Sequence, residues 1–167
     1  MSDNPACFAL LLALRARVPA VVIDPKRFSP REGFDRELAR VVDKAKVELI
    51  ALAGFMRILS PWFVRRYKGR ILNIHPALLP AFPGAHGVKE ALSSGVKMTG
   101  VTVHFVDEKV DRGPIIAQFP VPVREEDTQE SLLARIHRVE HRLYPKVIGW
   151  VLRGSVKMTG RKVRFVR

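Results

Sequence analysis

Short apolar runs that alternate with helical segments constrain the fold of this chain more than any other feature of its sequence. The runs 47–53 and 71–74 are rich in Val, Ile, Leu and Ala, as buried strands are. Ahead of the first of them, Phe34, Leu38, Val41 and Val42 recur at the spacing of one helical face. This alternation predicts an α/β fold with a largely parallel sheet flanked by helices.

Start and stop signals divide the chain into expected elements. Asn4-Pro5, Ser29-Pro30 and Ser60-Pro61 each place a proline after an N-cap residue, and Asp127 with Glu130 forms a capping box. The expected helices are 5–16, 30–42, 61–67, 88–94 and 127–153, the last kinked at Pro145. The expected strands are 20–23, 47–53, 71–74, the alternating run 101–106 and its hairpin partner 115–123, with a terminal hairpin in 155–166.

Composition limits the classes of partner. The 167 residues, 47% hydrophobic and 27% charged, are typical of one globular domain over residues 1–167. A formal net charge of +13 favours anionic ligands, but the basic residues are scattered and lack an RNA-binding pattern, so nucleic acid is not expected. The sequence shows no apolar run of about 20 residues and no secretory start. Its lone Cys7 is predicted to be buried and inert, and we expect a cytoplasmic protein away from membranes.

A polar pair at a strand end is the strongest local candidate for chemistry. Asn73 and His75 lie two residues apart in an expected strand, so their side chains share a face. An amide donor beside an imidazole suits the oxyanion that develops in acyl transfer. On spacing alone such a pair is more often structural, and Asp111 in Val110–Pro114 reads equally well as a turn residue. No metal-ligand spacing is present, so no metal is expected.

Four segments of the chain, in order and without large gaps, resemble one family. The matching segments are Leu52–Pro61, Leu72–Pro80 with Phe82-Pro83-Gly84, Thr102–Val106 with Val110–Ile116, and Glu140–Pro145. They are similar to the corresponding parts of the glycinamide ribonucleotide formyltransferases. The resemblance implies a Rossmann-like formyltransferase fold. It also implies transfer of a formyl group from 10-formyltetrahydrofolate, as co-substrate, to the glycyl amine of glycinamide ribonucleotide in purine synthesis.

The same resemblance implies roles for individual residues. His75 is the general acid, Asn73 donates to the formyl oxygen, and Asp111 stabilises protonated His75. The residues placed around the folate are Arg31, Met56, Arg57, Ile58, Leu59, Asn73, Asp107, Glu108, Lys109, Val110 and Asp111. Glu140 binds the glycinamide part of the nucleotide and His137 lies one turn away. His86, His104 and His141 are interpreted as structural or surface residues.

The chain departs from the family at its beginning. An opening strand, glycine-rich loop, helix and second strand of about 30 residues are expected before Met1, and the loop and helix start would hold the substrate phosphate. A misplaced start codon and a degraded copy both account for this, and the upstream genomic sequence would decide between them. We expect weak folate binding, little transfer by residues 1–167 alone, and self-association through unpaired strands.

Three other functions compete with the transferase. A formyltetrahydrofolate hydrolase would use water as acceptor, but a second histidine is expected where Pro76 follows His75. A methionyl-tRNA formyltransferase would explain the charge, but should carry a further C-terminal domain. An inactive relative that binds folate or a partner subunit is the non-enzymatic alternative, and the resemblance also allows a homodimer.

Overall fold

The computed structural model describes residues 1–29 and 31–166, apart from the side chain of Arg31. Contacts within the chain divide it into two compact units. The first consists of Met1–Val47 and Leu59–Phe63, and the second of Glu48–Ile58 and Val64–Arg167. The expectation of one domain over residues 1–167 stays a prediction.

The first unit is helical. It holds α1 (Phe8–Arg15), the short 3-10 helix η1 (Pro25–Arg27) and α2 (Arg31–Lys44). The α2 helix buries Phe34, Leu38 and Val42, which confirms the helical spacing predicted for them, while Val41 is only half-buried. Its expected start involves Pro30, which lies outside the described residues. Within this unit the buried Asp35 carboxylate accepts a hydrogen bond from the Ser60 amide.

The expected strand over 20–23 is wrong. Only a single parallel bridge forms there, between Val22 and Ser2, while the side chains of Val21 and Val22 remain exposed. A strand is stabilised by a ladder of hydrogen bonds along its length, and one bridge does not provide it. The apolar composition of this run was therefore a poor guide to its structure.

The first helix is shorter than expected. It begins at Phe8 rather than at Pro5, because the Asn4 side chain accepts a hydrogen bond from the Ala6 amide at 2.9 Å and holds a turn there. None of the eight residues of α1, all of them described, is buried. Cys7, just before it, is half-buried rather than buried as expected. The α1 helix therefore adds little to the core of its unit.

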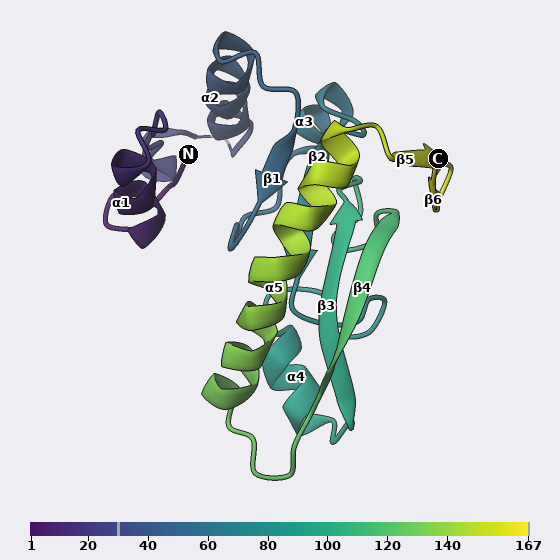
Figure 1. Cartoon of the computed structure of the whole chain (residues 1–167). Coiled ribbons are helices and arrows are strands. Elements are labelled where there is room, and N and C mark those ends of the chain that lie inside the picture. Colours follow the sequence, from purple (N-terminus) through teal and green to yellow (C-terminus); the bar gives the residue numbers. More distant parts are fainter. Residues whose placement is uncertain (30, 167) are drawn as a thin grey trace. The chain divides into compact units, whose positions relative to one another are not determined.

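The second unit is built on a four-stranded sheet (Figure 1). Its strands are β1 (Ile50–Leu52), β2 (Ile71–His75), β3 (Met98–Phe105) and β4 (Ile115–Pro122), in the order β1-β2-β3-β4. The α/β class is confirmed, but the described sheet is mixed rather than largely parallel. Only β1 and β2 run parallel, and the other two pairs are antiparallel. Residues 106–114 join β3 to β4 as a hairpin, which reverses the chain direction.

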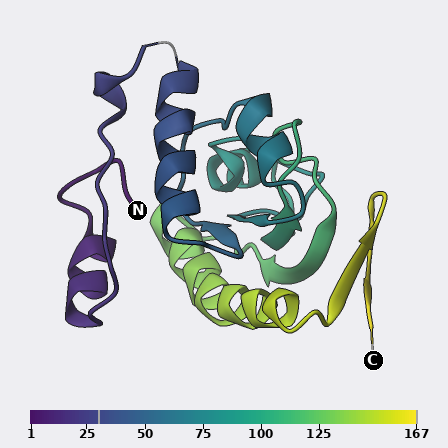
Figure 2. The ribbon, with the colours of Figure 1, turned by 90° about the horizontal axis from the view of Figure 1, so that it is seen from above.

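Most of the remaining elements confirm the expected ones within a few residues. These are α3 (Pro61–Arg66), α4 (Gly87–Ser93), α5 (Gln129–Leu152), β5 (Val156–Thr159) and β6 (Lys162–Phe165). Figure 2 shows α5 leading into the terminal hairpin of β5 and β6. Pro145 lies inside α5, and the helix continues past it. The main exception is β1, which is shorter than the expected strand over 47–53.

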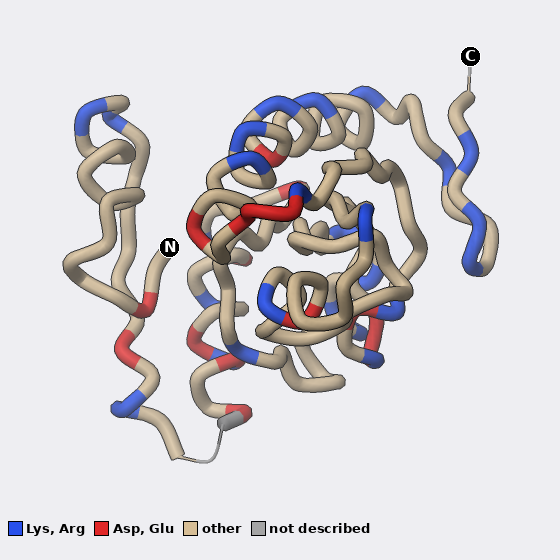
Figure 3. Tube along the Cα trace, turned by 90° about the horizontal axis from the view of Figure 1, so that it is seen from below, with Lys and Arg blue, Asp and Glu red and all other residues tan. Residues whose placement is uncertain are grey.

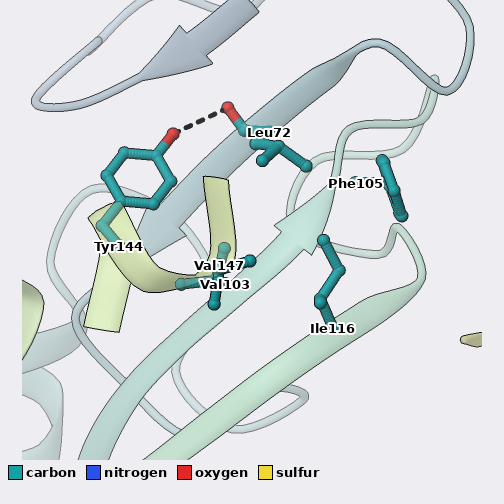
Figure 4. Close-up of a cluster of buried hydrophobic side chains, with 6 residues drawn as sticks. All are labelled: Leu72, Val103, Phe105, Ile116, Tyr144 and Val147. Carbon is teal, nitrogen blue, oxygen red and sulfur yellow. Dashed lines mark hydrogen bonds between the residues drawn. The ribbon is translucent and has the colours of Figure 1, made fainter. Parts of the chain in front are cut away.

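The core of the second unit lies between α5 and one face of the sheet. Leu72, Val103 and Phe105 on the sheet pack with Tyr144 and Val147 on the helix (Figure 4). The Tyr144 hydroxyl lies 2.8 Å from the carbonyl oxygen of Leu52 and 3.1 Å from that of Leu72, and burial raises its pKa. Successive side chains of a strand point to opposite faces of the sheet. Because α5 covers this face, the polar residues that alternate with the core residues of β2 and β3 must project from the other face.

The alternation of apolar and polar residues in 101–106 does not mark a strand with one face in solvent. Seven of the eight β3 residues are buried, on both faces of the strand. The polar members, Thr102 and His104, are 0% and 2% exposed. A polar side chain at alternate positions therefore marks the second buried face of β3 and not a solvent face.

The start of α5 carries a capping box that differs from the expected one. The N-cap is Thr128, whose hydroxyl accepts from the Ser131 amide at 3.2 Å, while the Ser131 hydroxyl accepts from the Thr128 amide at 3.1 Å. Asp127, the expected cap, instead pairs with Arg135. The hydrogen bond from Arg135 holds the pKa of Asp127 well below its usual range.

Removing the observed cap should destabilise the protein measurably. We expect Thr128→Ala to lower the free energy of unfolding by about 1 kcal/mol, because one helix-terminal N–H loses its partner. Urea unfolding followed by circular dichroism measures this, with Gln129→Ala at the next position as the matched control. Equal stability of the two variants would contradict the observed cap.

Within the described residues, no helix is both long and apolar enough to cross a lipid bilayer. The basic residues recur along α5, the connecting loops and the terminal hairpin (Figure 3). This spread agrees with the scattered pattern in the sequence.

Candidate active site

The register between β2 and β3 brings the candidate side chains to one face of the sheet. Asn73 lies directly opposite His104, and His75 directly opposite Thr102. Directly opposed residues of an antiparallel pair point to the same side. Leu72 belongs to the core under α5, so Asn73 and its neighbours project from the opposite face. The shared face predicted for Asn73 and His75 is thereby observed.

His75 is buried between two hydrogen-bond acceptors. Its side chain is 4% exposed, and its Nδ1 lies 3.4 Å from Asp111 Oδ2. Its Nε2 lies 2.8 Å from the backbone oxygen of Phe82. A carboxylate and a carbonyl oxygen can only accept hydrogen bonds, so this environment satisfies an imidazole that carries protons on both nitrogens. Both ring nitrogens of His75 therefore face hydrogen-bond acceptors.

The loop after β2 is held against the sheet by Thr102 and Gln118. The Thr102 hydroxyl donates to the Ala77 carbonyl at 2.7 Å and accepts from the Leu79 amide at 3.0 Å. Gln118 on β4 donates to the Leu79 carbonyl at 2.8 Å. These bonds position the segment that presents the Phe82 oxygen to His75.

Asp111 reaches the site from the loop between β3 and β4 through an unusual backbone conformation. Its φ of 51° lies in the left-handed region, which Asp and Asn tolerate better than other side chains. Its Oδ2 accepts the Gly84 amide at 2.8 Å. Gly113 lets the loop return, because a Cβ there would lie 1.7 Å from the Phe105 oxygen. Asp111 is thus a turn residue whose carboxylate also lies beside His75.

The charge of Asp111 is set by opposing effects. Burial by itself raises the pKa of its carboxyl group. The neighbouring His104 ring, the hydrogen bond from the Gly84 amide and the nearby His75 lower that pKa by more. The net effect is a lowered pKa, so the carboxylate is ionised at neutral pH and faces His75 as an anion.

His104 belongs to this cluster, although the sequence analysis interpreted it as a structural or surface residue. Its Nε2 lies 3.4 Å from Asn73 Nδ2 and 3.7 Å from Asp111 Oδ1. Its position opposite Asn73 follows from the strand register, which the sequence alone does not specify. One feature of the sequence could have indicated that His104 belongs here. His104 and Thr102 lie two residues apart in β3, so their side chains point to the same face of the sheet. Among the described residues, no group of three or more His, Cys, Asp or Glu could hold a metal ion.

The predicted folate residues have different environments. Met56 and Ile58 are 78% and 58% exposed, and Arg57 is also exposed. Leu59 is buried, so its side chain is not available to a ligand. The side chain of Arg31 lies outside what the structure describes. The loop after β1 therefore presents three of the four predicted side chains to solvent.

The loop before Asp111 is tied down by ion pairs. Glu108 pairs with Arg65 at 2.9 Å, and Asp107 lies 3.9 Å from Arg161. The Lys109 amide donates to Asp107 Oδ1 at 2.9 Å, while Lys109 and Val110 are exposed. A cavity of about 790 Å³ adjoins this loop, with Phe105, Val106 and Pro114 among its lining residues. Neither His75 nor Asp111 is among the residues that line it.

The predicted substrate residues lie together on α5. His137 Nε2 is 3.8 Å from Glu140 Oε2, and the His137 and His141 rings are 6.3 Å apart and nearly parallel. Burial raises the pKa of Glu140, although the two histidines act in the opposite direction. The structure thus brings Glu140 and His137 together, on the helix that packs against the other face of the sheet.

Comparison with known proteins defines the class to which this fold and cluster belong. The family model described as "Formyl transferase" matches residues 1–148. The chain belongs to the formyl transferase family.

Similar proteins within that class are named phosphoribosylglycinamide formyltransferase or glycinamide ribonucleotide transformylase. The phosphoribosylglycinamide formyltransferase of Escherichia coli (strain K12) is 43% identical over 157 residues, which are 94% of this chain and 74% of that protein. The crystal structure of glycinamide ribonucleotide transformylase 1 from Symbiobacterium toebii has a TM-score of 0.96 and 45% identity. That match covers 99% of this chain and 78% of that one.

A longer relative contains a similar region. The trifunctional purine biosynthetic protein adenosine-3 of Drosophila melanogaster is 48% identical over 155 residues. The match covers 93% of this chain but only 12% of that protein. The family resemblance inferred from sequence motifs is confirmed by these comparisons.

Proposed function

We propose that this chain transfers a formyl group from 10-formyltetrahydrofolate to the glycyl amine of glycinamide ribonucleotide. The observation that carries the proposal is the cluster at the end of β2 formed by the buried His75 with the half-buried Asn73 and Asp111. It occurs in a chain that is similar over nearly its whole length to proteins named phosphoribosylglycinamide formyltransferase. Folate and nucleotide are therefore the proposed partners.

The cluster supplies what attack by an amine on a formyl group requires. The amine nitrogen forms a bond to the formyl carbon, and the carbonyl oxygen becomes an oxyanion. Asn73 Nδ2–H and protonated His75 are donors that can stabilise this oxyanion. His75 then gives a proton to the leaving nitrogen of the folate as the carbon–nitrogen bond breaks, and the proton that the attacking amine nitrogen loses restores the imidazolium. No covalent enzyme intermediate is needed, because the amine is itself the nucleophile.

Asp111 makes this role of His75 feasible at neutral pH. The ionised carboxylate 3.4 Å from His75 Nδ1 balances the positive charge of the imidazolium in a buried site. At the other side of the ring, Nε2–H faces the Phe82 oxygen in the present structure. We infer that the reacting oxygen or nitrogen replaces Phe82 as the acceptor when the substrates bind.

The remaining predicted contacts complete the proposal. The exposed side chains of Met56, Arg57 and Ile58 and the loop 107–111 would contact the folate. Arg57 and Arg31 suit its carboxylates through charge-assisted hydrogen bonds. Glu140 would hold the glycinamide group, with His137 beside it. The cytoplasmic location remains part of the same proposal.

A paired assay tests the function. The chain is incubated with 10-formyltetrahydrofolate in the presence and in the absence of glycinamide ribonucleotide, at high enzyme concentration so that slow turnover is detected. We expect tetrahydrofolate to appear together with formylated nucleotide only when the nucleotide is present. Equal tetrahydrofolate release without nucleotide would identify a hydrolase, and no release in either arm would contradict the proposed transfer.

A further inference from the structure

His104 is deeply buried, and the geometry around it specifies one of its protons. Its Nδ1 lies 2.8 Å from the backbone oxygen of Phe105. A carbonyl oxygen accepts and never donates, so Nδ1 carries a hydrogen. The remaining question is whether Nε2 has a lone pair or a second proton, because that choice decides which neighbour His104 binds.

Two neighbours of Nε2 place opposite demands on it. Asn73 Nδ2, a donor, is 3.4 Å away, and Asp111 Oδ1, an acceptor, is 3.7 Å away. The shorter distance is at the long end of the hydrogen-bond range, and the longer one exceeds it. Asp111 also faces His75, and one buried carboxylate balances one positive charge, not two. Distance and charge both favour a lone pair on Nε2 and a neutral His104.

We propose that neutral His104 is a positioning residue that accepts a hydrogen bond from the Asn73 amide and thereby determines which end of that amide meets the substrate. This inference rests on the proposed function. Rotation of the amide by half a turn would exchange its oxygen and its NH2 group. An acceptor at His104 Nε2 binds one N–H of Asn73 and leaves the other for the formyl oxygen. An amide turned the other way would present its own oxygen and repel the developing oxyanion.

The protonation state can be measured in the unmodified chain. Ring nitrogen resonances of the ¹⁵N-labelled 167-residue protein are recorded from pH 6 to pH 8, with His104→Gln and His75→Gln spectra used for assignment. We expect His104 to show a protonated Nδ1 and an unprotonated Nε2 at pH 7. An imidazolium at His104, or a neutral ring protonated at Nε2, would overturn the proposal. This readout requires no activity and no variant that must remain functional.

Kinetics test the link to Asn73. We expect His104→Phe, which keeps a ring of similar size, to lower kcat about tenfold with little change in either KM. In an Asn73→Ala background the same change should cost less than about twofold, because the amide that His104 positions is already gone. Independent, multiplying losses would overturn the positioning role. His86→Phe, at an exposed position, is the matched control.

The two proposals fail in different ways. If the chain transfers no formyl group under any condition, the proposed function fails, and the ring nitrogen spectrum still decides the state of His104. If transfer occurs but His104 is an imidazolium paired with Asp111, the function stands and the positioning role fails.

Discussion

Replacement of His75 by glutamine should reduce kcat for formyl transfer about a thousandfold, within the range by which a positioned general acid accelerates a reaction. A Gln side chain can still donate a hydrogen bond toward the Phe82 oxygen that lies 2.8 Å from His75 Nε2. It cannot release a proton to a leaving nitrogen and return it at neutral pH. Because His75 acts only as the reaction proceeds, kcat and kcat/KM should fall together. Single-turnover measurement of tetrahydrofolate release checks this.

The control for this variant is the same substitution at another histidine. His86 is exposed and its side chain makes no capping hydrogen bond to α4, so His86→Gln should keep the wild-type rate. Near-ultraviolet circular dichroism of both variants verifies that the fold is retained. A folded His75→Gln protein with more than about a tenth of the wild-type kcat would exclude His75 as the general acid.

Asp111→Asn should lower kcat about a hundredfold while folate affinity stays within about a few fold. Asparagine also tolerates the left-handed backbone found at Asp111, and its side-chain oxygen can still accept the Gly84 amide at this position. The substitution therefore removes the charge with little change of shape. Protonated His75 then loses the anion 3.4 Å from its Nδ1. Turnover and folate binding, measured separately, distinguish this from a general collapse of the loop.

The same variant has a defined effect on the pH dependence of stability. The pKa of Asp111 is lower in the folded protein than its usual value, which is about 3.9 in an unfolded chain. Its ionised form therefore contributes stability that is fully present above that value and is lost as the pH falls through the lower folded pKa. The difference in free energy of unfolding between wild type and Asp111→Asn should shrink as the pH falls from about 6 to about 3.

Urea unfolding at several pH values measures that difference. Glu126→Gln removes a carboxylate from an exposed position in the same unit and is the matched control. A difference between wild type and Asp111→Asn that stays constant over this range would show that the Asp111 charge is not coupled to folding. Full activity of Asp111→Asn would reduce Asp111 to a turn residue.

The sequence by itself determined the features that depend on local periodicity. The helical face of Phe34, Leu38 and Val42 and the shared face of Asn73 and His75 both follow from the fixed geometry of helices and strands. The family motifs around these residues also sufficed to identify the family. These predictions needed no knowledge of which segments meet.

The sequence predicted less well those elements whose structure depends on a contact with another part of the chain. The run 20–23 has the composition of a strand but forms only one bridge, because a strand requires a partner along its length. Thr128 and not Asp127 caps α5, since Asp127 is held by Arg135 eight residues further along. The hairpin between β3 and β4 was expected, but the sheet is mixed also because β3 pairs antiparallel with β2. In each case a competing contact outweighed the local signal.

The family motifs named Asn73, His75 and Asp111, but only the tertiary structure decided how their side chains meet and that His104 lies among them. Asp111 meets His75 because a left-handed turn and the close approach at Gly113 direct its loop back to the sheet. His104 joins them because the register of β3 sets it opposite Asn73, and a shift by one residue would turn it to the core under α5. Register and loop closure are long-range properties that arise from pairing between distant segments. No local pattern in the sequence specifies them.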